Sequence, residues 1–137
     1  MPDYAISVTL TATYADTVDR TRDALADQGF GILTEIDVAA TMKAKLDIDV
    51  APHLILGACN PPLAHQAIGI EPSIGLLLPC NVVVRSIDDA HTLVEAMNPT
   101  VMVSATGNPA LSDVADQAGT RLHAALAALS ASGETPA

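Results

Sequence analysis

Apolar and polar residues alternate along several stretches of the chain and predict five strands. Residues 4–11 place Tyr4, Ile6, Val8 and Leu10 on one side and smaller or polar residues on the other. A period of two is typical of a strand that buries one face. The same pattern in residues 30–38 places Phe30 and every second residue after it on one face. Three further strands are expected at residues 53–58, 74–85 (interrupted by Pro79) and 91–97.

Helical periodicity and capping residues predict the helices between these strands. Thr13 and Gly29 are suited to begin and end a helix, and Asn60 followed by Pro61 is a strong start signal. The last helix has a continuous apolar stripe. Helices are expected at residues 14–28, 38–46, 60–70 and 109–130, while residues 100–105 fit either a strand or a helical turn.

The resulting order of elements, β-α-β-(α)-β-α-β-β-α, lacks the regular alternation of strands and helices that is typical of a parallel βαβ fold. It favours a single α+β domain with the helices packed on one face of the sheet. The expected domain covers residues 1–130, and residues 131–137 are expected to form a flexible C-terminal tail.

Charge and composition exclude some classes of partner. The net charge of −10 weighs against nucleic acid, which requires a basic face, and against an anionic membrane surface. No apolar run is long enough to span a membrane, and the first four residues do not resemble a signal peptide. We therefore expect a cytoplasmic protein whose two cysteines, Cys59 and Cys80, are reduced.

Four stretches resemble a known family. They are residues 29–38 (GFGILTEIDV), 55–65 (ILGACNPPLAH), 74–84 (IGLLLPCNVVV) and 107–111 (GNPAL), and they resemble the domain-of-unknown-function family 302. The resemblance implies a curved, mainly antiparallel sheet with helices on one side, similar to the TATA-box-binding-protein fold. It also implies a homodimer, and it implies no particular activity.

Two Cys-Asn steps are the main candidates for chemistry. Cys59-Asn60 ends a strand and opens a helix, where the helix dipole and free N–H groups favour a thiolate. Cys80-Asn81 lies in the next strand, so the two steps could meet at one end of the sheet. Both cysteines could instead be buried core residues, an interpretation that the sequence favours more for Cys80 than for Cys59, and Asn60 could act only as a helix cap.

Two further groups of residues are weaker candidates for a functional site. His65 follows Cys59 by six positions, and Cys59, His65 and Cys80 would form a soft set of ligands for Cu(I) or Zn(II), although their spacing matches no standard zinc pattern. Glu35 and Asp37 share one face of a strand and could pair for acid–base work, but such pairs are more often solvated.

Three functional hypotheses remain open. The preferred one is a small binding module that takes a small ligand or soft metal near Cys59, Asn60, Cys80 and Asn81. The second is a thiol enzyme in which Cys59 is the nucleophile or sulfur carrier and Cys80 resolves it. The third is a protein-interaction module without a small-molecule site.

Overall fold

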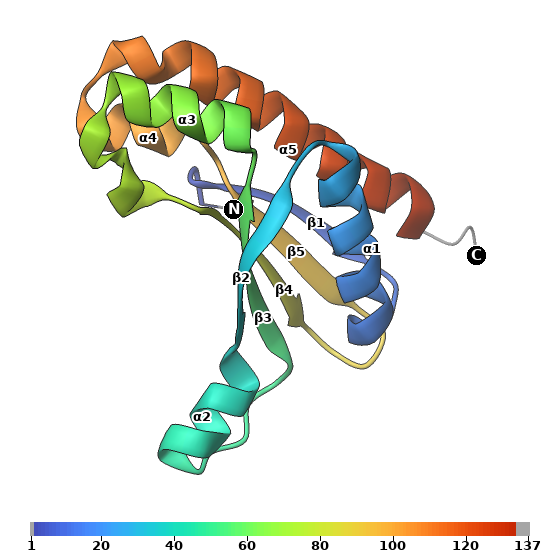
Figure 1. Cartoon of the computed structure of the whole chain (residues 1–137). Coiled ribbons are helices and arrows are strands. Elements are labelled where there is room, and N and C mark those ends of the chain that lie inside the picture. The colour runs from blue at the N-terminus through green and yellow to red at the C-terminus, as the bar shows by residue number, and fades with distance from the viewer. Residues whose placement is uncertain (1, 134–137) are drawn as a thin grey trace.

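A five-stranded antiparallel sheet with the order β1-β5-β4-β3-β2 forms the centre of the molecule (Figure 1). The structure is a computed structural model and describes residues 2–133. It confirms the predicted α+β class with helices on one face. The elements are β1 (Ala5–Leu10), α1 (Tyr14–Asp27), β2 (Gly31–Asp37), α2 (Val38–Leu46), β3 (His53–Cys59), α3 (Pro61–Ile70), the 3₁₀ helix η1 (Pro72–Leu77), β4 (Cys80–Ser86), β5 (Thr92–Met97), α4 (Thr100–Thr106), the 3₁₀ helix η2 (Pro109–Leu111) and α5 (Ser112–Gly133).

Strands β2 to β5 pair with their neighbours in the chain, whereas β1 pairs with β5 at one edge of the sheet. The chain therefore crosses from one edge of the sheet to the other between β1 and β2, and α1 makes this crossing. Figure 1 shows α1 lying beside α5, while α3 and α4 gather at one end of the molecule.

Two clusters of buried side chains form the interior. The first, called the sheet core here, lies between the sheet and the helices α1 and α5. It consists of Ile6, Leu10, Ala24, Leu25, Phe30, Leu54, Leu56, Ala58, Val82, Val84, Val94, Ala96, Leu122, Ala125, Leu126 and Leu129. The second, called the end core, joins α3, η1, α4, η2 and the first half of α5. It consists of Leu63, Ala67, Ile74, Met102, Leu111, Val114, Ala115 and Ala118.

The prediction of one long strand at residues 74–85 is wrong for the first half of this range. Pro72 starts the 3₁₀ helix η1, which continues to Leu77, and the Leu78–Pro79 peptide bond is cis. Regular pairing with β3 begins only at Cys80. Because proline has no N–H to donate to the ladder, the strand starts after Pro79.

The C-terminal third resolves one open point and shifts two boundaries. Residues 100–105 lie in a helix, α4, which ends at Gly107 in a left-handed conformation. The expected last helix is divided into η2 and α5, and α5 continues to Gly133, past the expected end at Ser130. The remainder of the expected tail, residues 134–137, lies outside the described residues.

Strand β2 contains a bulge that the alternation did not predict. Ile32 pairs with Ala58 and Thr34 with Gly57, so Leu33 is an extra residue on this strand. A single extra residue moves every later side chain to the opposite face. Ile32 therefore packs against the sheet core, whereas Ile36 is 48% exposed on the uncovered face, and the single face expected for residues 30–38 is wrong.

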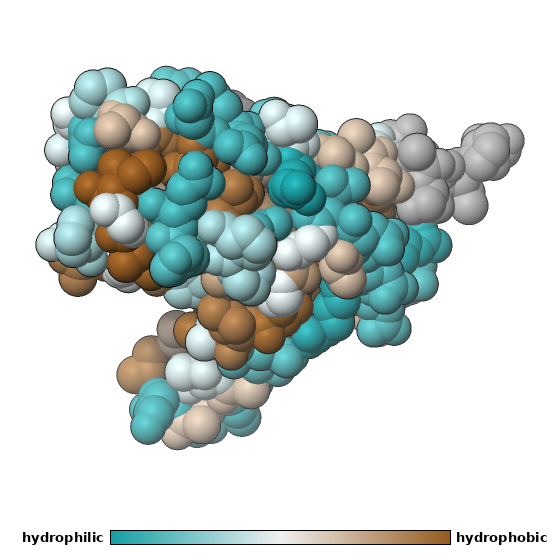
Figure 2. Space-filling view, turned by 45° about the horizontal axis from the view of Figure 1, so that its top comes forward, coloured by the Kyte–Doolittle hydropathy of each residue, from teal (hydrophilic) through white to brown (hydrophobic). Residues whose placement is uncertain are grey.

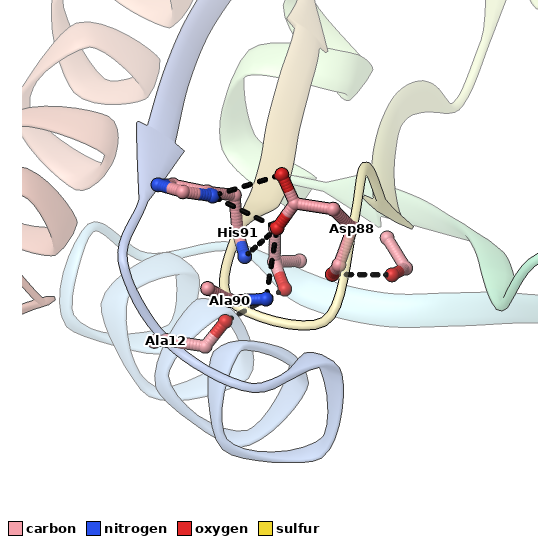
Figure 3. A network of polar contacts seen from close by, with 6 residues as sticks. Ala12, Asp88, Ala90 and His91 are labelled. Atoms are coloured by element: carbon pink, nitrogen blue, oxygen red, sulfur yellow. Dashed lines mark hydrogen bonds and ion pairs between the residues drawn. The ribbon is translucent and has the colours of Figure 1, made fainter.

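The turn between β4 and β5 is organised by one carboxylate (Figure 3). Asp88 Oδ1 accepts hydrogen bonds of 2.8 Å from the backbone N–H groups of Ala90 and His91, and it lies 2.8 Å from His91 Nδ1. The side-chain contact with His91, followed by the bond from Ala90, lowers the pKa of Asp88. Thr92 Oγ1 donates to the carbonyl oxygen of Ala12 at 3.0 Å, which fixes the turn to the start of α1.

Residues 38–52, called the arm here, project from the sheet on α2 (Figure 1). None of the nine residues of α2 is buried. Figure 2 shows hydrophobic surface on this part of the molecule and at the end where α3 lies. On the arm this surface includes Leu46, Ile48 and Val50, which are 43–62% exposed.

Candidate functional site

Cys59 lies at the junction of β3 and α3. It is the last residue of β3 and is half-buried, and the next residue, Asn60, begins α3 as its cap. Asn60 Oδ1 accepts a hydrogen bond of 3.3 Å from the N–H of Leu63, which satisfies one of the free donors of the first turn. The predicted cap is therefore confirmed, and it orients the helix that follows Cys59.

Gly29, which follows the end of α1, lies beside this cap. Its φ of 83° lies in the left-handed region that favours glycine. A Cβ atom at this position would lie 3.1 Å from Nδ2 of Asn60. The glycine predicted to end α1 therefore also gives the Asn60 side chain its space.

Cys80 is the first residue of β4 and is buried. It pairs across the sheet with Ala58, the neighbour of Cys59. The two Cys-Asn steps therefore lie at the same end of the sheet, one residue apart in the pairing of β3 with β4. Both thiols are free.

Cys59, Asn60 and Cys80 line one small cavity of about 30 Å³ where the sheet core meets the end core. Its rim includes the half-buried residues Ala64 and Pro79. The lining is almost wholly apolar and consists of Phe30, Ala58, Cys59, Asn60, Leu63, Ala64, Ala67, Leu78, Pro79, Cys80, Met102, Val114 and Ala118.

Gly57 holds one wall of this cavity in place. A Cβ atom on Gly57 would lie 2.7 Å from Cγ of Pro79 and closer still to Oγ1 of Thr34. Only glycine lets β2 and the Leu78–Pro79 segment approach β3 so closely. The position of the rim therefore depends on the absence of a side chain at this point.

The surroundings of Cys80 keep its thiol protonated. Burial, and to a smaller extent the neighbouring Cys59 thiol, raise the pKa of Cys80 from 9.0 to about 11. Cys80 is consequently a neutral, buried thiol at physiological pH.

Two of the predicted site residues do not join the cavity. Asn81 pairs with Gly57 and is exposed on the uncovered face of the sheet, in a shallow groove with Tyr4 and Met97. Successive residues of a strand point to opposite faces, so Asn81 cannot share the side on which Cys80 is buried.

His65 is exposed on α3 and does not line the cavity. In the described part of the chain, no three His, Cys, Asp or Glu side chains lie close enough together to hold one metal ion. The expected ligand set of Cys59, His65 and Cys80 is therefore not assembled, because residue 65 turns away from the cavity on the outer side of the helix.

The carboxylates Glu35 and Asp37 do share a face of β2, but each has a structural partner. Glu35 forms an ion pair of 2.7 Å with Arg22 of α1. Asp37 caps α2 by accepting a hydrogen bond from the N–H of Ala40 at 2.9 Å. Burial, followed by the charges of Asp37 and Glu35, raises the pKa of Tyr14. This arrangement stabilises the local fold and has no features of an acid–base pair.

Met102 is the lining residue that sequence reasoning missed. It lies on α4, is 3% exposed, and lines the cavity together with the two cysteines. The only available signal was the helical turn that residues 100–105 allowed. Nothing in the local pattern around Met102 indicates that it approaches the two cysteines.

The fold and the site together define a small α+β domain with a compact thiol-lined cavity between its two cores. The chain belongs to the family described as domain of unknown function DUF302, whose model matches residues 6–129. The crystal structure of the "uncharacterized conserved protein DUF302 from Bacillus stearothermophilus" is similar, with 28% identity, a TM-score of 0.83, and coverage of 92% of this chain and 98% of that chain. No curated protein matches the sequence.

Within the described residues, no helix has the length and apolar character needed to cross a membrane.

Proposed function

We propose that this protein is a small binding module whose site is the cavity lined by Cys59, Asn60 and Cys80. The observation that carries the proposal is the meeting of both thiols in one apolar space at the junction of two cores. Apolar cavities with a few convergent polar groups are typical binding sites. Because both thiols are free, the proposal fits a reducing compartment such as the cytoplasm.

The size of the cavity restricts its occupant. Pockets for drug-sized molecules measure about 300–1,000 Å³, whereas this cavity has a volume of about 30 Å³. A space of this size accommodates a few atoms without rearrangement. The proposal is therefore limited to a very small ligand or a soft metal ion.

Native mass spectrometry of protein purified without chelator tests this proposal. We expect extra mass on the wild-type chain and none on Ala64→Leu, which places a larger side chain at the rim. Gln66→Leu adds the same side chain on the exposed side of α3 and is the matched control. Absence of bound mass from the wild type, or equal bound mass on Ala64→Leu, would contradict the proposal.

The thiol-enzyme hypothesis is a second candidate, favoured by the place of Cys59 at the start of α3. The pKa of about 11 weighs against Cys80 as its resolving partner, because only on the order of 1 in 10⁴ such thiols is ionised at pH 7. Iodoacetamide labelling of the Cys59→Ser and Cys80→Ser variants tests this candidate. Faster labelling of Cys59 is expected, and equal or faster labelling of Cys80 would eliminate it.

A homodimer is a third element of the proposal, and the arm favours it. Isolated helices shorter than about 12–15 residues are marginal in water, yet α2 has nine residues and buries none of them. Leu46, Ile48 and Val50 add exposed apolar surface beside it. The charge of Lys43 is already balanced within the arm by Asp47 at 3.1 Å and Asp49 at 3.5 Å, so the exposed apolar side chains carry this part of the proposal.

Light scattering over a wide range of concentrations measures this association. We expect a dimer for the wild type and a monomer for Leu46→Glu combined with Ile48→Glu. Ile68→Glu, which changes a similarly exposed residue on α3, is expected to remain dimeric. A monomeric wild type would refute the dimer, and would leave the cavity proposal untouched.

A further inference from the structure

We infer that the cavity is a Cu(I) site whose ligands are the sulfur atoms of Cys59, Cys80 and Met102. This inference rests on the proposed binding function and specifies its occupant. It adds Met102, a thioether that sequence reasoning did not connect with the cysteines.

Three different parts of the fold bring the sulfur-bearing side chains to one space. Cys59 comes from the end of β3, Cys80 from the start of β4, and Met102 from α4. All three line the same cavity. Cys80 and Met102 are buried, and Cys59 is half-buried near the rim. Two of the three proposed ligands are thus shielded from solvent, and the third is partly accessible.

The chemistry of the lining selects a soft cation. Apart from these sulfur atoms and Asn60, the lining side chains carry only hydrocarbon groups. Thiolate and thioether ligands favour Cu(I), whereas Mg²⁺ and Ca²⁺ need several oxygen ligands. The oxygen of Asn60 is already used by the N–H of Leu63.

The number of ligands separates Cu(I) from Zn²⁺. Structural zinc sites are almost always four-coordinate, with ligands from Cys, His, Asp or Glu. Within the described residues no cluster of even three such side chains exists. Cu(I) is stable with two or three sulfur ligands, which is the number that this cavity supplies.

The charge balance is compatible with an enclosed site. Binding forms Cu–S bonds to two thiolates, releases two protons to solvent and leaves copper as Cu(I), so no oxidant or reductant is consumed. Two thiolates, one monovalent cation and a neutral thioether carry a net charge of −1. The dipole of the ten-residue helix α3, which begins directly after Cys59, favours negative charge here, but its first turn adds no free donor: Pro61 and Pro62 have no N–H, and the N–H of Leu63 is bound by Asn60.

An anaerobic titration with Cu(I) in competition with bicinchoninate measures the stoichiometry and affinity. We expect one Cu(I) per chain, loss of this binding in Cys59→Ser and in Cys80→Ser, and about tenfold weaker binding in Met102→Leu. Met42→Leu changes a methionine on α2, and His65→Ala changes the exposed histidine of α3. Both are expected to bind Cu(I) as the wild type does. Circular dichroism checks that each variant is folded.

X-ray absorption of the loaded protein identifies the ligands directly. A coordination shell of sulfur alone is expected, and a nitrogen or oxygen ligand, or unchanged binding by the Cys80→Ser variant, would overturn the inference. So would the absence of Cu(I) binding by the wild type. If native mass spectrometry then shows an organic mass that depends on Ala64, only the copper assignment fails. If it shows no bound mass, the binding function fails with it.

Discussion

The two halves of α5 are equally buried but pack very differently. The second half contributes Leu122, Leu126 and Leu129 to the sheet core, while the first half contributes the smaller Val114, Ala115 and Ala118 to the end core. All six side chains are 5% exposed or less. Nevertheless, Val114 and Ala118 border the cavity between the two cores, whereas none of the three leucines does; Leu129 instead lines a separate surface hollow between α1 and α5. Burial alone therefore does not close an interior; the size of the side chains on the helix decides where space remains.

Leu122→Ala is the strongest test of this difference. Leu122 is fully buried in the sheet core, so its truncation should leave a cavity and lower the free energy of unfolding by about 2–5 kcal/mol. Urea unfolding measures the loss. His123→Ala, the exposed neighbour on the same helix, should change stability by less than about 0.5 kcal/mol. A loss as small as this for Leu122→Ala would show that this half of α5 is not tightly packed.

The thiol at the border between the two cores should make stability depend on pH. Because the pKa of Cys80 rises from 9.0 to about 11 on folding, the unfolded thiol ionises first and the unfolded state binds fewer protons in this range. Stability contributed by the protonated thiol is complete below pH 9 and falls between pH 9 and 11, by about 2–3 kcal/mol in total.

Urea unfolding of metal-free protein at a series of pH values measures this slope. Cys80→Ala should lack the contribution, and Cys59→Ala should retain most of it. Identical slopes for Cys80→Ala and the wild type would mean that Cys80 is not buried as described.

Gly57→Ala should disturb the rim of the cavity and leave the sheet core intact. The added methyl group would press on Pro79 and Thr34, and overpacking of this kind costs about 1–3 kcal/mol. Displacement of Pro79 should also make Cys80 react faster with iodoacetamide. Gly69→Ala adds a methyl group where nothing lies within 4 Å and is the matched control. Unchanged stability and labelling in Gly57→Ala would show that the rim is not held at this point.

Of these variants, Asn60→Ala should lower the free energy of unfolding by the smallest measurable amount. Comparison with Asn81→Ala shows whether the asparagines of the two Cys-Asn steps have different structural roles. Loss of the cap on α3 should cost about 0.5–2 kcal/mol and loosen the end core more than the sheet core. Asn81→Ala, on the uncovered face, should cost less than about 0.5 kcal/mol. Amide hydrogen exchange in α3 and in α5 compares the two cores. Equal losses for both variants would show that the cap is not responsible.

Several elements were predictable because their signals are local. The Thr13 and Asn60 caps, Gly29 and the alternation from Ile6 to Leu10 depend on backbone conformation within a few residues. The expected place of Tyr4 on the same buried face is wrong, since this side chain is 65% exposed. In addition, one proline and one bulge made two of the strand predictions partly wrong. Because of Pro79, the strand expected at residues 74–85 begins only at Cys80, and the extra residue Leu33 reverses the faces of the second half of β2.

The candidate site was only partly predictable, for the same reason. Cys59 and Cys80 were recognised because each is followed by asparagine in the sequence, and the cap at Asn60 indicated where α3 begins. Asn81 shares that pattern but points to the other face of the sheet. Met102 has no such local mark, and its approach to the cysteines depends on how α4 packs on α3 and α5.

The sequence by itself determined the class of fold, the helix caps and the expectation of two neighbouring thiols, because periodicity and capping act over one or two turns of chain. Only the tertiary structure decided that β1 lies beside β5, that the cysteines line a space of about 30 Å³, and that Met102 completes it. These features depend on contacts between residues far apart in the chain. Whether such contacts fill a space or leave it open is set by side-chain volumes on several elements at once.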